Sequence, residues 1–192
     1  KNFDAALEQA KKSSTGYFAG IPTYIKDLTN NEGIKTFYGS EALITIPPSK
    51  QTDPIAKQIF DQGFIHMGNS SLPEFGLTCS TELIHQEDTR NPWQTDYSCG
   101  GSSGGAAALV AAGVVPIAHS ADGGGSTRIP ADHIELAVRG HRLADEAGDV
   151  LFAACIALQR FGGAAGLADQ LDRFIDGVGL VDGKELGAFF RE

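Results

Sequence analysis

The chain has 192 residues, of which 42% are hydrophobic and 20% are charged, and its formal net charge is -9. This composition is ordinary for a folded protein with a proper core. Nucleic acids and anionic membrane surfaces are bound through basic surfaces, so the acidic balance argues against both as main partners. The expected partner is a small molecule, and self-association into a homo-oligomer stays open.

Cysteine usage and hydropathy limit the cellular setting. The three cysteines are odd in number and show no C-x-x-C spacing, so neither a disulfide framework nor a zinc site is indicated. The longest apolar run, AAALVAAGVVPIA at 106–118, is too short to cross a bilayer, and no N-terminal stretch has the pattern of a signal peptide. We therefore expect a cytoplasmic protein with no membrane association.

The N-terminal third predicts alternating helices and strands. A helix is expected in KNFDAALEQAKKS (1–13), and a short buried strand in FAGIPTYIKDLTN (18–30), with Lys26 at its end. An amphipathic helix that ends near Gln62 and a strand in FIHMG (64–68) follow. This alternation indicates an α/β arrangement.

Two glycine tracts flank the most apolar part of the chain. CGGSSGG (99–105) precedes a predicted buried helix, AAALVAAG (106–113), and DGGGSTRIPA (122–131) follows a predicted strand in VPIAHSAD (115–122). A flexible linker has no reason to adjoin such buried elements. We therefore interpret both tracts as loops in which glycine lets backbone N–H groups approach a ligand.

From residue 132 onward the composition changes to Ala, Leu, Asp, Gly and Arg, without proline. Asp132 and Glu135 have the spacing of a capping box, and apolar residues recur at helical intervals from Val150 to Phe161. We predict three or four helices here. The sequence thus divides into a first part, 1–131, and a helical second part, 132–192.

Some residues around the glycine tracts could support amide or ester hydrolysis. That chemistry needs a nucleophile, a base and donors for an oxyanion. Ser126 follows three glycines, and Lys26 at a buried strand end could be kept neutral by desolvation. Taken singly, each feature has an ordinary explanation, a solvated lysine in one case and a serine that caps a loop in the other.

The combination of motifs is more specific. A lysine in GIPTYIKD is followed by GGSSGG and then DGGGSTRIPA, with Ser102 and Ser126 24 residues apart. Together with GNSSLPEFG (68–76) and TRNPW (89–93), this order resembles the amidase signature family of serine hydrolases over about residues 15–131. The resemblance implies part of that family's mixed α/β sheet flanked by helices, here followed by the helical C-terminal segment.

The resemblance also implies catalytic roles, in a Ser-cisSer-Lys triad. Ser126 would be the nucleophile, Ser102 the bridging serine whose preceding peptide bond is cis, and Lys26 the neutral base that drives proton transfer through Ser102. The substrate would be a small carboxamide or linear amide, hydrolysed through an acyl-enzyme. No metal or organic cofactor is implied.

Further residues would complete the site. The resemblance implies that the backbone N–H groups of Gly123, Gly124, Gly125 and the nucleophile Ser126 form the oxyanion hole. Asp122 and Ser103 would support this loop through hydrogen bonds. Arg128 is expected to be structural.

A histidine-dependent serine hydrolase is the first alternative. GGSSG (100–104) also satisfies the G-x-S-x-G nucleophile elbow, with Asp122 and then His133 or His141 in the required order. An elbow serine should follow a clear strand, whereas TRNPWQTDYSC is polar and resembles a turn. Otherwise all five histidines are expected to be structural.

The second alternative is not enzymatic. The family pattern stops after Ala131, where the sequence continues as DHIELAVRGHR. The chain could therefore be a truncated or fused fragment without catalytic activity, in which the helical C-terminal part mediates assembly.

Overall fold

The computed structural model describes residues 2–12, 15–84, 86–134 and 154–157. The helices predicted elsewhere in the C-terminal part lie outside these residues, and the division after residue 131 stays a prediction. In chain order the elements are α1 (Phe3–Ala10), β1 (Pro22–Lys26), η1 (Glu41–Leu43), α2 (Pro54–Asp61), β2 (Ile65–Ser70), η2 (Glu74–Gly76), α3 (Gly104–Ala111), β3 (Ile117–Ser120) and β4 (Ala154–Ala157).

The described strands form two parallel pairs. β1 pairs with β2 from Pro22 opposite Ile65 to Lys26 opposite Ser70. β3 pairs with β4 along its whole length. The α/β class predicted from the sequence is confirmed, and the elements predicted up to residue 122 are present.

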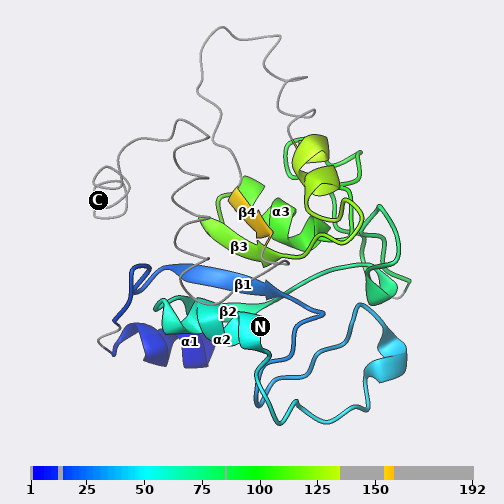
Figure 1. Cartoon of the computed structure of the whole chain (residues 1–192). Helices are drawn as coiled ribbons and strands as arrows, with labels where there is room; N and C mark the ends of the chain where they lie inside the picture. Colours follow the sequence, from blue (N-terminus) through cyan, green and yellow to red (C-terminus); the bar gives the residue numbers. More distant parts are fainter. Residues whose placement is uncertain (1, 13–14, 85, 135–153, 158–192) are drawn as a thin grey trace, which may run out of the picture. The chain divides into compact units, whose positions relative to one another are not determined.

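β1 lies between two layers of helix. Its successive side chains point to opposite faces of the strand, so each layer receives its own set. Tyr24 packs on one face in a cluster with Ala106 and Val110 of α3, Ala118 of β3, and Val115 between these two elements. Ile25 packs on the other face in a cluster with Ile59 of α2 and with Phe64, which precedes β2. Figure 1 shows α2 and α3 on opposite sides of the strands. β1 is thereby fixed from both sides, and so is the lysine at its end.

β1 and β3 are joined through side chains. Thr23 Oγ1 donates to the main-chain oxygen of Ile117 at 3.0 Å. Two residues further along β3, His119 Nδ1 accepts the main-chain N–H of Lys26 at 3.2 Å. The carboxyl ends of β1 and β3 therefore lie side by side, and the loops that follow them meet there.

The helix predicted between Val150 and Phe161 is wrong for its central residues. Ala154–Ala157 form strand β4, parallel to β3. Periodicity alone does not distinguish a short apolar run in a buried strand from one in a buried helix. Pairing with β3, a long-range contact, decides the outcome here.

The capping box predicted at Asp132 is also wrong. Residues 128–134 are helical, so Asp132 lies inside a helix that has already begun. The N–H of Ile129 donates to Gly125 O at 2.8 Å, in the helical pattern. The carboxylate at this helix start belongs to Asp122 instead. Within the described residues, no helix is long and apolar enough to cross a membrane.

Candidate active site

The carboxyl end of β1 brings Lys26 to Ser102. Lys26 is the last residue of β1 and is 1% exposed, and Ser102 is 2% exposed. Lys26 Nζ lies 2.8 Å from Ser102 Oγ and 3.4 Å from the main-chain oxygen of Ala121. A buried lysine is rare unless its head group has partners, and both partners here are uncharged.

The protonation of Lys26 follows from this setting. Burial lowers the pKa of Lys26 from 10.5 to about 8, because the ammonium form loses its hydration, and the nearby Asp122 carboxylate only partly opposes this effect. The amine is therefore neutral in an appreciable fraction of molecules near pH 8. This direction agrees with the predicted neutral base.

The backbone around Ser102 is unusual. The peptide bond between Gly101 and Ser102 is cis, the geometry that the resemblance implies. Gly101 also touches another part of the chain, since a Cβ placed on it would lie 2.8 Å from the backbone of Ser80. At this position glycine is needed for a close approach of two backbones, and the tract is not a linker.

Ser103 connects the two glycine tracts. Its Oγ donates to Ala121 O at 3.2 Å, and its N–H donates to the main-chain oxygen of Ser126 at 3.0 Å. Ser103 is fully buried. The two tracts, far apart in the sequence, are therefore joined through Ser103.

The structure brings Ser126 to the same unit through its main chain. Its side chain is half-buried. Within the described part of the chain, Ser126 Oγ makes no hydrogen bond, with Ser102 or with any other residue. Lys26 and Ser102 are thus in direct contact, whereas Ser126 is joined by its main chain to Ser103, the residue after Ser102.

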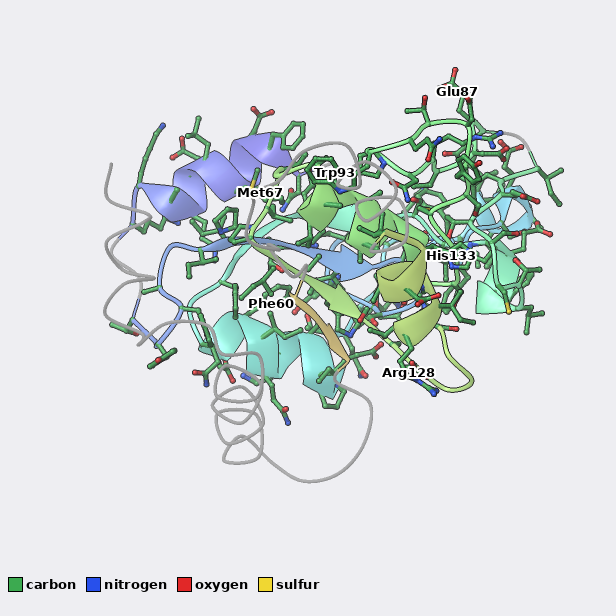
Figure 2. All side chains as sticks on the ribbon, turned by 90° about the horizontal axis from the view of Figure 1, so that it is seen from above. Phe60, Met67, Glu87, Trp93, Arg128 and His133 are labelled. Atoms are coloured by element: carbon green, nitrogen blue, oxygen red, sulfur yellow. The ribbon has the colours of Figure 1, made fainter. Side chains whose placement is uncertain are left out.

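Asp122 organises the loop that carries Ser126. Its carboxylate accepts the N–H groups of Gly125 at 2.7 Å and Thr127 at 3.2 Å. Arg128 Nε and a terminal guanidinium nitrogen each donate to it at 2.9 Å. This bidentate pair and the backbone bonds hold the pKa of Asp122 well below its usual range. Figure 2 labels Arg128 on the helix that follows. The guanidinium of Arg128 is thus paired with Asp122.

The expected set of oxyanion donors needs one correction. The N–H of Gly125 is already bonded to Asp122, and this glycine has a φ of +117°, which favours glycine. Gly123 and Gly124 are exposed, and among the described residues their N–H groups and that of Ser126 have no acceptor. These three N–H groups remain as candidate donors.

The structure argues against the histidine-dependent alternative. No strand leads into Ser102, because residues 86–101 contain only the isolated bridge between Arg90 and Ser98. His133 is exposed, and its Nδ1 lies 2.9 Å from Ile129 O of its own helix (Figure 2). His141 lies outside the described residues.

One residue near the site was not singled out from the sequence. His119 is 2% exposed and accepts the main-chain N–H of Lys26. The sequence signal for it was its place at the end of a predicted strand, three residues before Asp122. Among the described residues, no group of three acidic, cysteine or histidine side chains could hold a metal ion.

Known proteins resemble this chain over the same region. The amidase family model matches residues 2–137. AmiC of Mycobacterium leprae, a candidate amidase, is 44% identical over 130 residues, which cover 67% of this chain and 27% of that protein. A glutamyl-tRNA(Gln) amidotransferase subunit of Methanosarcina acetivorans is 42% identical over 132 residues, which cover 67% and 28%.

Solved structures agree with this result. A bacterial aryl acylamidase of the amidase signature enzymes superposes with a TM-score of 0.63 at 34% identity, over 68% of this chain and 29% of that one. The chain therefore spans less than a third of the length of each of these three relatives.

Proposed function

Because this chain belongs to the amidase family, we propose that it carries the catalytic centre of an amide hydrolase built on Lys26, Ser102 and Ser126. The observation that carries the proposal is the 2.8 Å contact between Lys26 Nζ and Ser102 Oγ at a buried strand end. A lysine with a pKa of about 8 can act as a base near neutral pH, which an ordinary lysine cannot.

The proposed proton path runs through both serines. As Ser126 Oγ attacks the substrate carbonyl carbon, its proton moves to Ser102 Oγ, and the proton of Ser102 moves to the neutral amine of Lys26. When the tetrahedral intermediate collapses, the C–N bond breaks and the proton returns along the same path to the leaving amine. Water then hydrolyses the acyl-enzyme, with Lys26 again as the base.

The negative charge of the tetrahedral intermediate needs donors in place before the reaction. We propose that the N–H groups of Gly123, Gly124 and Ser126 supply them, since the structure leaves these groups without an acceptor among the described residues. Asp122 keeps the loop in shape by binding Gly125 and Arg128. Asp122 is thus a positioning residue and does not take part in proton transfer.

For the substrate we propose a small carboxamide or linear amide. The relatives support an amide of some kind, because they include a candidate amidase, an aryl acylamidase and one subunit of an amidotransferase. No step above requires a metal or an organic cofactor, because the lysine and the two serines move all the protons.

Reaction with a fluorophosphonate tests the proposal directly. We expect the intact mass of the protein to increase by one adduct, and Ser126→Ala to remove it while circular dichroism stays unchanged. Lys26→Ala should slow adduct formation strongly, whereas His133→Ala should not. A folded protein that forms no adduct, or an adduct that persists in Ser126→Ala, would contradict this assignment, and the first result would favour the non-catalytic alternative.

A further inference from the structure

His119 is a buried histidine whose imidazole makes one hydrogen bond within the described residues, to the main-chain N–H of Lys26. We propose that His119 is a positioning residue for Lys26, whose imidazole anchors the lysine main chain at the end of β1 and so directs the amine at Ser102. This inference rests on the proposed function, in which Lys26 is the base. It adds a residue outside the triad that acts through the lysine.

The main chain and the amine of Lys26 both contact one short segment at the end of β3. The main-chain N–H of Lys26 donates to His119 Nδ1 at 3.2 Å, and its Nζ lies 3.4 Å from Ala121 O, two residues further along the chain. The next N–H, that of Asp27, donates to Ser70 O of β2 instead. The end of β1 is therefore held from β3 at Lys26 and from β2 immediately after it.

The imidazole can fulfil this role only in one form. To accept the Lys26 N–H, Nδ1 must carry a lone pair, so the ring is neutral with its proton on Nε2. Burial and the positive charge of Lys26 lower the pKa of His119 to about 4, which keeps the ring neutral at ordinary pH. A protonated ring would lose the acceptor and would place a second cation beside the lysine.

Packing alone does not account for a histidine at position 119. Within the described residues His119 Nε2 is buried and has no hydrogen-bond partner, so the ring does not tie Lys26 to another polar group there. His66, also buried, differs because its Nε2 lies 2.9 Å from Gly68 O in its own strand. For packing alone, an apolar side chain at position 119 would avoid an unpaired buried N–H.

Three substitutions separate the two ring nitrogens. His119→Asn keeps an acceptor atom at the same number of bonds from Cα as Nδ1. His119→Gln places its polar atoms at the distance of Nε2, and His119→Leu removes both. Thr23→Val is the matched control, because it deletes the other side-chain link between β1 and β3, the bond to Ile117 O, and leaves the Lys26 N–H bonded.

We expect His119→Leu and His119→Gln to lower kcat for amide hydrolysis by about 10- to 100-fold with little change in KM, because a displaced base affects proton transfer more than substrate binding. His119→Asn should retain most of the wild-type kcat, and Thr23→Val should resemble the wild type. An unchanged kcat in His119→Leu would overturn the inference. So would equal losses in His119→Asn and His119→Leu.

A readout independent of turnover covers the case in which amide hydrolysis is not found. The pKa of Lys26 can be followed by NMR of its Cε carbon in the intact protein. It should stay near 8 in His119→Asn and rise towards 10.5 in His119→Leu, as the amine moves towards water. Ser126→Ala tests the proposed function separately, and a Lys26 pKa that is the same in all three His119 variants overturns the positioning role. If His119→Leu does not fold, the Asn and Gln pair decides.

Discussion

Replacing Lys26 by methionine should stabilise the protein at neutral pH while abolishing its proposed activity. Lys26 titrates near 10.5 when unfolded and at about 8 when folded, so the unfolded chain binds more protons between these values. Each pKa unit corresponds to about 1.4 kcal/mol, so burying the ammonium destabilises the wild type at pH 7 by roughly 3 kcal/mol relative to high pH. Lys26→Met also loses the hydrogen bond to Ser102, which costs about 1 kcal/mol, so the expected net stabilisation of the variant is about 2 kcal/mol.

The pH dependence of this difference identifies its cause. Because the folded pKa is lowered, wild-type stability rises relative to Lys26→Met as pH increases through the window from 8 to 10.5. The advantage of the variant should shrink by roughly 2 to 3 kcal/mol between pH 7 and pH 10. Urea unfolding of both proteins at pH 7, 8, 9 and 10 measures it, and effects common to both cancel.

A matched control is Lys57→Met, at an exposed lysine of α2 that pairs with Asp61 on the surface. This substitution removes an amine from the surface, and the same urea series measures its stability difference from the wild type. Two results would contradict a destabilising buried ammonium at Lys26. One is that Lys26→Met is less stable than the wild type at pH 7, and the other is that the stability difference between the two proteins does not change with pH. The first result would mean that the folded protein stabilises the ammonium form, and the second that folding leaves the proton affinity of Lys26 unchanged.

Three further outcomes follow from the surroundings of the site. Asp122→Asn should lower the urea midpoint at pH 7. The difference in midpoint from the wild type should narrow as pH falls below 3.8, because the folded pKa of the carboxyl is depressed and its contribution to stability is lost on protonation. Gly105→Ala should cost about 1 to 3 kcal/mol in thermal unfolding, since its Cβ would overlap the backbone of Ser71. Iodoacetamide at pH 8 should alkylate exposed Cys79 but not Cys99, whose thiol has a pKa raised by burial to about 11, and peptide masses report both.

Local patterns predicted the elements up to residue 122 because hydrophobic periodicity and glycine stops act over short distances. The strand that ends at Lys26 and the helix after GGSSGG are examples, and both match the structure. The helix predicted across Ala154–Ala157 failed because its pairing partner, β3, lies more than thirty residues earlier. The N-cap at Asp132 failed because a competing carboxylate, Asp122, lies at the start of the same helix.

The residue types of the candidate site and their order can be read from the sequence, since Lys26, Ser102 and Ser126 each lie in a recognisable local motif. Which atoms come into contact depends on the three-dimensional fold. The contact of Lys26 with Ser102 joins residues 76 positions apart, and the bond from Lys26 to His119 joins residues 93 apart. Burial, which lowers the pKa of Lys26, also comes from packing on both faces of β1. Proximity and desolvation depend on the whole fold, and a local pattern contains neither.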